Sequence, residues 1–242
     1  MCTVTFIPGR DHIYLTSNRD EKHWRQDAIE PNVYEFISGK ILFPKDADAG
    51  GTWIAAHENG NAIVFLNGGF VAHQPHPPYR KSRGLILLDL IEGSTPYNSF
   101  LAVKLNNIEP FTAVVWDDEH LFECRWDGKE KHSKQLDEKL PHIWSSVTLY
   151  DEETIRKRNR WFGEWLNNKS VPAWDEILHF HQFTGDGDSH NDLRMNRHGK
   201  VFTVSVTSLH ISAQKASMQY VDLKNNRRSE QSLLIEKTMV GR

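Results

Sequence analysis

The sequence predicts a layered α+β fold with mainly antiparallel sheets, and three observations support it. Strand-like and helix-like stretches come in blocks, in the order strands, helix pair, strands, helix pair, strands. Turn sequences such as Asn59-Gly60 join successive strands, as in hairpins. No Gly/Ser-rich or Pro-rich linker divides the 242 residues, so we expect one domain, 1–242. Helices covering both outer faces of two stacked sheets would satisfy this order.

The first predicted element is a hairpin of strands 2–7 and 12–17, because apolar residues alternate in both and a Pro-Gly turn sequence lies between them. If residues 8–11 form the whole turn, Cys2 stands opposite Ser17. Side chains alternate between the two faces of a strand, so the even residues of the first strand share a face with the odd residues of the second.

The second hairpin is predicted from strands 52–57 and 62–66 around Asn59-Gly60, the strongest short turn signal. With a two-residue turn, Thr52 stands opposite Asn67. Two glycine pairs, Gly50-Gly51 and Gly68-Gly69, would then meet at one end of this hairpin.

The later elements follow from caps and periodicity. Ser82 opens an apolar-periodic helix that Gly93 ends, and Thr95-Pro96 is an N-cap followed by proline at the first helical position. Asp151 caps a third, charged helix. Helices are therefore expected at 82–92, 95–106, 151–168 and 172–183, and further strands at 111–116, 120–126, 201–211, 217–223 and 232–238.

Composition excludes several classes of function. Lysine and arginine number 29 against 32 acidic residues, and the basic residues are dispersed, so nucleic-acid binding is not expected. No stretch approaches 18 apolar residues, so neither a signal peptide nor a membrane span is expected. Cys2 and Cys124 are far apart and fit no disulfide framework or zinc spacing. We therefore expect a cytoplasmic protein without metal or cofactor.

Cys2 is the most informative residue because it directly follows Met1, which aminopeptidases remove before small side chains. The mature chain would then begin with a thiol and a free α-amine on one residue. The amine, with a pKa of about 7.7 to 8, can take the proton of a thiol whose pKa is about 8.5. Nucleophile and base on one residue define the N-terminal nucleophile hydrolases. The alternative is that Cys2 is simply a buried apolar strand residue.

Arg19 falls on the same strand face as Cys2, as its diagonal neighbour, within reach of an arginine side chain. A guanidinium there would favour the thiolate or hold a substrate carboxylate. Asp20 points to the other face unless the chain turns at 18–21. The alternative is that this charged run is a solvated strand end.

Asn67-Gly68-Gly69 directly follows an apolar strand and is a candidate oxyanion site, formed by the Asn67 side chain and the Gly68 amide. Trp53, beside the opposite glycine pair, is a candidate to line a substrate cleft. The alternative is that both glycine pairs are ordinary hairpin-end turns.

Together these segments resemble the NRDE family, also called the transport and Golgi organisation family. The resemblance rests on five motifs within the first 84 residues. They are Met1-Cys2, Asn18-Arg19-Asp20-Glu21, Gly50-Gly51-Thr52-Trp53, Asn67-Gly68 and Arg83-Gly84.

The resemblance implies a four-layer αββα sandwich of the N-terminal nucleophile hydrolase type. It makes the site similar to those of choloylglycine hydrolases and penicillin V acylases, with Cys2 as nucleophile and Asp20 as partner of its amine. Two departures stand out: Arg19 and Asp20 are adjacent, where those relatives separate them by two residues. The stretch that aligns with their late asparagine, 144–147, offers only serines.

The leading hypothesis is a cysteine amidohydrolase that cleaves a non-peptide C–N amide through a Cys2 thioester. Catalytic roles fall to Cys2, Arg19, Asp20 and Asn67, and substrate-binding roles to Asn18, Trp53, Gly68 and Gly69. The main alternative is a non-catalytic carrier of haem or another hydrophobic ligand, since the family resemblance extends to haem handling. A third is an interaction scaffold with a decayed site. The partner is thus a small-molecule amide or a hydrophobic ligand, and the oligomeric state stays open.

Overall fold

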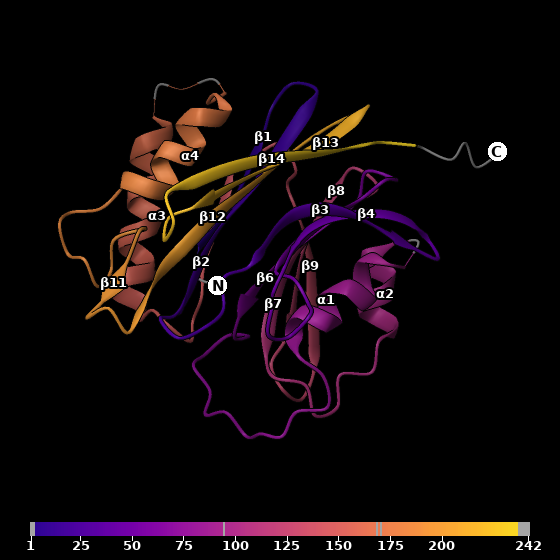
Figure 1. Ribbon diagram of the computed structural model, residues 1–242, viewed down its shortest axis with the longest axis horizontal. Helices are drawn as coiled ribbons and strands as arrows, with labels where there is room; N and C mark the ends of the chain where they lie inside the picture. Colours follow the sequence, from indigo (N-terminus) through magenta and orange to yellow (C-terminus); the bar gives the residue numbers. More distant parts are fainter. Residues whose placement is uncertain (1–2, 94, 168, 170, 237–242) are drawn as a thin grey trace.

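The computed structural model describes residues 3–93, 95–167, 169 and 171–236. Cys2 therefore lies outside the described residues, as does the end of the strand predicted at 232–238. Within the described residues, two seven-stranded antiparallel sheets pack face to face between two pairs of helices (Figure 1).

Sheet A carries the N-terminal strand in its interior. In spatial order it contains β10 (His142–Ser145), β1 (Thr3–Pro8), β2 (His12–Lys22), β12 (Val201–Ser212), β13 (Lys215–Asp222) and β14 (Arg227–Leu234), and β11 (Asn196–Arg197) pairs with β12. Sheet B is a meander in chain order. It contains β3 (Ile29–Phe36), β4 (Gly39–Lys45), β5 (Ile54–His57), β6 (Ala62–Asn67), β7 (Phe111–Asp117), β8 (His120–Trp126) and β9 (Lys131–Leu136).

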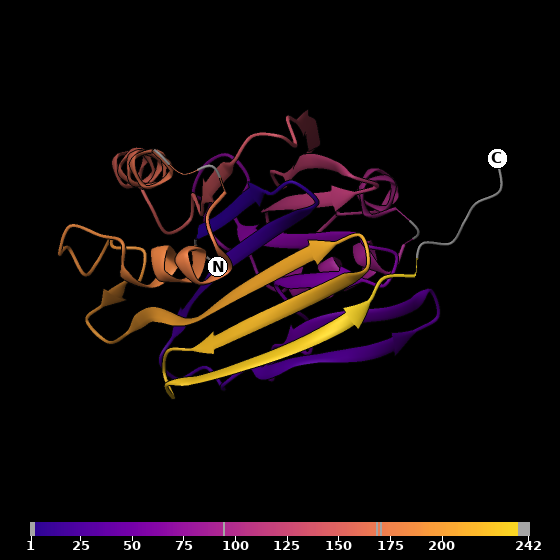
Figure 2. The ribbon, with the colours of Figure 1, turned by 90° about the horizontal axis from the view of Figure 1, so that it is seen from above.

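The helices form the outer layers (Figure 2). Helices α1 (Arg83–Ile91) and α2 (Pro96–Ala102) cover sheet B, whereas α3 (Glu152–Leu166) and α4 (Trp174–Phe183) cover sheet A. Three apolar cores fill the spaces between the layers, the largest between the two sheets. The four-layer αββα sandwich implied by the family resemblance is confirmed.

Alternation along β1 and β2 decides which side chains face each layer. Val4 and Phe6 pack in the core between the sheets, together with Leu15 of β2. Ile7 and Tyr14, which have the opposite parity, pack against α3 and α4 instead. The predicted sharing of faces between the two strands is therefore confirmed.

The register of the first hairpin differs from the prediction by two residues. Val4 pairs with Ser17 and Pro8 with Ile13, because the four-residue turn spans 9–12 instead of 8–11. The Gly9 amide donates to the His12 carbonyl across this turn, at 2.8 Å. Moving the turn by one residue moves every pair by two, which leaves each side chain on its predicted face.

The register of the second hairpin differs from the prediction by one residue, and this smaller difference has a larger consequence. Its loop has three residues, 58–60, with Gly60 at φ 94°, and Ala56 pairs with Ala62. The Phe65 amide bonds the Trp53 carbonyl at 2.9 Å, which continues the same register. Thr52 therefore does not stand opposite Asn67, and that prediction was wrong. A three-residue loop with glycine at its left-handed position is an alternative to the two-residue turn.

Candidate active site

The candidate site lies where β1 begins. Thr3 pairs with Asn18 on one side and with Ser145 on the other, so the strand that follows Cys2 is held between β2 and β10. Ser146, the next residue after β10, donates its hydroxyl to the carbonyl of Asn67, at 2.9 Å. The start of β1, the end of β10 and the end of β6 therefore meet at one end of the sandwich.

Arg19 is buried in this region, with 4% of its surface exposed. Its Nη2 donates to Oδ2 of Asp46 at 2.7 Å, and its guanidinium lies 4.7 Å from the centre of the Trp53 ring. The Trp53 indole N–H in turn donates to Oγ1 of Thr207. Trp53 is buried and packs against the Arg19 guanidinium, and its role in lining a substrate cleft stays an untested prediction. A cavity of about 10 Å³ beside Arg19 has room for about one water molecule.

Asp46 is a site residue that sequence reasoning missed. Its carboxylate accepts hydrogen bonds from Arg19, from Arg25 and from the amides of Asp48 and Ala49. Burial raises the pKa of Asp46, but the Ala49 amide and the two guanidinium groups outweigh it and hold that pKa below its ordinary value. Aspartate at the start of a loop commonly binds amides two and three residues later, which was the available signal.

Asp20 faces the opposite side of sheet A, as a regular strand requires. Its Oδ2 accepts from the Tyr150 hydroxyl at 2.7 Å, and its Oδ1 accepts from Thr203 at 2.6 Å. The chain does not turn at this point, since β2 continues to Lys22. Asp20 and Arg19 therefore lie on different faces of the sheet.

A buried network on this second face leads from Asp20 to the start of β1. The Arg158 guanidinium lies 3.6 Å from the centre of the Tyr150 ring and donates to Oγ1 of Thr3. Arg158 is fully buried. This residue of α3 carried no sequence motif, so nothing in the pattern predicted its contact with β1.

Asn18 is fully buried and holds structural partners on both ends of its amide. Its Nδ2 donates to the carbonyls of His181 and Leu193, each at 3.0 Å, and its Oδ1 bonds the Nδ1 of His181. Both N–H groups of this buried amide are used, so Asn18 attaches α4 to sheet A, and its substrate-binding role stays an untested prediction.

The glycine motifs also serve packing. A Cβ on Gly51 would lie 2.4 Å from the backbone of Gly84, and one on Gly68 would lie 2.6 Å from Val147. The Gly68 N–H donates to the Pro110 carbonyl at 3.0 Å, so it is not free for an oxyanion. The carbonyls of Gly68 and Gly69 both accept from the Thr112 hydroxyl. Half-buried Asn67 remains the oxyanion candidate at the end of β6.

A cavity of about 330 Å³ adjoins this end of the sandwich. It lies between β10 of sheet A and strands β6 to β9 of sheet B. Its lining includes Leu66, Thr112, Glu123, Arg125, Lys134 and Ser145. Among the residues that the structure describes, no group of three or more His, Cys, Asp or Glu side chains could hold a metal ion. None of the helices described is long and apolar enough to cross a membrane.

Solved structures with a similar fold include an acid amidase and a conjugated bile acid hydrolase. A variant of conjugated bile acid hydrolase from Clostridium perfringens superimposes with a TM-score of 0.63 at 10% identity, covering 99% of this chain and 100% of that chain. The Caenorhabditis elegans ortholog of N-acylethanolamine-hydrolyzing acid amidase gives a TM-score of 0.58 at 10% identity, covering 86% and 92%. At such identity the likeness establishes the N-terminal nucleophile hydrolase fold alone.

A search of curated protein sequences gives no match. The sequence model of the Transport and Golgi organisation 2 family, in contrast, matches residues 1–236, nearly the whole chain. The match agrees with the motifs at Asn18 to Glu21 and at Asn67-Gly68. The chain therefore belongs to the Transport and Golgi organisation 2 family.

Proposed function

We propose that this chain is a cysteine N-terminal nucleophile amidohydrolase that cleaves a non-peptide C–N amide bond through Cys2. One observation supports this best: the strand that directly follows Cys2 is held beside Ser145, Ser146 and the end of β6. The fold adds support, because the solved structures that share it are named as hydrolases of a conjugated bile acid and of N-acylethanolamines.

In this proposal the α-amine of mature Cys2 takes the thiol proton, and the thiolate adds to the amide carbonyl carbon. Collapse of the tetrahedral adduct breaks the C–N bond, and the amine leaves with the proton. The acyl group stays on sulfur as a thioester. Water then adds to the thioester carbonyl and the C–S bond breaks, which releases a carboxylic acid and the free thiol.

Three further residues take roles in the proposal. Arg19 supplies positive charge to the thiolate or to an anionic substrate, and Asp46 fixes its guanidinium. Asn67 supplies its side-chain amide to the oxyanion. The Gly68 amide is dropped from the oxyanion site, because it already donates to Pro110.

The test is the intact mass of the full chain before and after reaction with a chloroacetamide, an amide that carries an electrophilic carbon. We expect a mass without Met1 and one adduct on the peptide that contains Cys2. The matched control is Cys2→Ala, which should lose this adduct and still lose Met1. A chain that keeps Met1, or whose adduct persists in Cys2→Ala, contradicts the proposal.

The carrier alternative has less support. A larger cavity, about 1140 Å³, lies at the other end of the sandwich and has an apolar side that includes Trp116 and Ile211. Among its charged lining residues, seven are acidic, and only Arg10 and Lys139 are basic. Carboxylates repel the two propionates of haem, so this cavity does not favour it. A haem titration of the purified protein should therefore give no stoichiometric Soret shift.

A further inference from the structure

The cavity of about 330 Å³ beside Ser145 has a chemistry that the proposed reaction does not by itself require. Its floor belongs to the face of sheet B that looks toward sheet A. Thr112 pairs with Leu66, and Glu123 pairs with Val114, and both apolar partners lie in the core between the sheets. The cavity therefore opens within the same layer as the candidate site, next to the strand that follows Cys2.

Glu123 cannot bind a ligand in this cavity, because its acceptor sites are filled. Its Oε1 accepts from Arg125 Nε at 3.0 Å and lies 3.3 Å from Lys134 Nζ. Its Oε2 accepts from Arg125 Nη2 at 3.1 Å and from the Trp144 indole at 2.6 Å. A carboxylate has about four acceptor positions, and these four donors occupy them. Burial raises the pKa of Glu123, but Arg125, Trp144 and Lys134 together hold it below its ordinary value, so the group stays anionic.

The two cations around Glu123 keep donors to spare. Nη1 of Arg125 donates to the Gly69 carbonyl at 2.6 Å, which leaves one unused N–H on each of the two terminal nitrogens. Lys134 keeps two of its three N–H groups, and its side chain is 61% exposed. One carboxylate and two cations leave a local charge of about +1 at neutral pH.

Ser145 does not belong to this group of donors, although it lines the cavity. Its neighbour Trp144 lies in the core between the sheets, whereas Ser145 pairs with Thr3, whose hydroxyl accepts from Arg158 of α3. The Ser145 side chain therefore points to the other face of sheet A, toward the helices.

We propose that this cavity is a subsite for a carboxylate, so that the substrate is a small amide that also carries a carboxylate group. The remaining donors of Arg125 and Lys134 would bind the carboxylate oxygens. The volume lies at the lower end of ligand pockets, which suits a compact substrate. This inference names the substrate class for the function proposed above and rests on it.

The test compares N-acetylglycine with N-acetylglycinamide, two amides that differ in the carboxylate alone. We expect the protein to bind N-acetylglycine on the order of tenfold more tightly, as one or two charged hydrogen bonds would give. Calorimetry measures affinity, and NMR of the Trp144 indole N–H reports on the cavity because that group bonds Glu123. Lys134→Gln should remove most of the preference and leave the affinity for N-acetylglycinamide unchanged.

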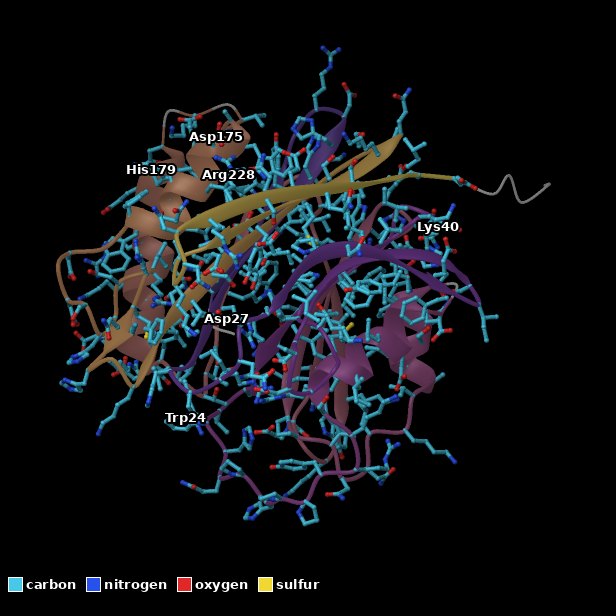
Figure 3. The ribbon with its side chains drawn as sticks, in the orientation of Figure 1. Trp24, Asp27, Lys40, Asp175, His179 and Arg228 are labelled. Atoms are coloured by element: carbon cyan, nitrogen blue, oxygen red, sulfur yellow. The ribbon has the colours of Figure 1, made fainter. Side chains whose placement is uncertain are left out.

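The matched control is Lys40→Gln, which makes the same change of charge on β4 of the same sheet, outside the cavity (Figure 3). It should behave as the wild-type chain does. Equal affinities for the two amides, or equal preferences in Lys134→Gln and Lys40→Gln, would overturn the subsite.

The affinities are measured in the Cys2→Ala background, which cannot turn the amides over, so the two proposals fail separately. A carboxylate preference in Cys2→Ala, together with a wild-type chain that forms no Cys2 adduct, would support the subsite and refute the amidohydrolase. Cys2 adducts and hydrolysis of neutral amides, without any carboxylate preference, would do the reverse.

Discussion

At the scale of single residues, the unusual feature is a set of buried polar groups between sheet A and its helices. Arg158 is fully buried, yet among the described residues its guanidinium donates only to neutral oxygens, those of Thr3, Asn191 and Asp192. A buried charge is costly unless several groups solvate it. The carbonyl dipoles and the face of the Tyr150 ring solvate the guanidinium here. The contact with Thr3 gives this cation a direct link to the beginning of β1.

His181, in contrast, is neutral because burial depresses its pKa, and the hydrogen bonds assign its tautomer. Asn18 donates both Nδ2 bonds to carbonyls, so its Oδ1 must accept from Nδ1 of His181. Nε2 then accepts from the Thr5 hydroxyl, at 2.8 Å. We infer this tautomer from the network. Burial, aided by the charge of Arg158, lowers the pKa of His181 to about 3.

This depressed pKa predicts a stability that falls in acid. The unfolded chain binds a proton at His181 near pH 6.5, whereas the folded chain resists protonation down to about pH 3. Between these values the unfolded state binds more protons, so stability rises with pH by up to about 1.4 kcal/mol per unit. From pH 7.5 to 5.0 the contribution of His181 should fall by about 2 kcal/mol, and urea unfolding at both pH values measures it.

Protonation of acidic residues also lowers the stability of the protein in acid, so the measurement needs matched variants. His181→Gln should show a smaller loss than the wild-type chain over this interval. His179→Gln changes an exposed histidine on the same helix (Figure 3) and should show the full loss. Identical losses in all three proteins would mean that His181 is not neutral in the folded state.

At the scale of elements, glycines fix how α1 approaches sheet B. Gly51 precedes β5, and the backbones of Gly51 and Gly84 come so close that a Cβ on either would meet the other segment. The Thr52 amide also donates to the Gly84 carbonyl, at 3.2 Å. The motifs Gly50-Gly51-Thr52-Trp53 and Arg83-Gly84 are therefore two sides of one contact, which positions the loop of Asp46 and hence Arg19.

Substitution of these glycines should separate crowding from helix propensity. In Gly51→Ala the new Cβ would lie 2.4 Å from the Gly84 carbonyl carbon, so backbone must move, and we expect a loss of about 1–3 kcal/mol or more. Gly163→Ala is the control, because a Cβ in that helix meets nothing within 4 Å. It should stabilise the fold by about 0.5–1 kcal/mol. Chemical denaturation measures the free energy of unfolding of both variants. A change of the same sign in both would contradict the close contact of Gly51 with Gly84.

The sequence did not predict strands β3, β4, β9, β10 and β11. Of these, β3, β9 and β10 form sheet edges, β4 lies next to β3, and β11 pairs with β12 outside the main strand order. The residues of β9 are mostly polar, β10 has four residues and β11 has two. Short or mostly polar strands lack the run of alternating apolar residues that identifies a strand in a sequence. Helix α2 likewise ends at Ala102, short of the predicted residue 106.

At the scale of the whole molecule, local patterns predicted the layers better than the site. Hairpin turns and helix caps are set by residues close together in the sequence, and most of the hairpins and helices predicted from them were correct. Asp46, Tyr150 and Arg158 approach the start of β1 from distant segments, so only the packed sandwich reveals them. Arg19 was predicted because its face follows from strand alternation, which a two-residue register change preserves.

The packed sandwich also predicts how the two thiols of the sequence react. Cys124 is fully buried in the core between sheet B and its helices, and burial, with Glu123 and Asp117 nearby, raises its pKa to about 12. Only the thiolate reacts, so Cys124 should resist iodoacetamide at pH 8 until the chain unfolds. We expect one label on the native protein, in the Cys2 peptide, and two in denaturant. Cys2→Ala should take no label in the native state and one label in denaturant. A label on Cys124 in the native protein would mean that this core opens readily.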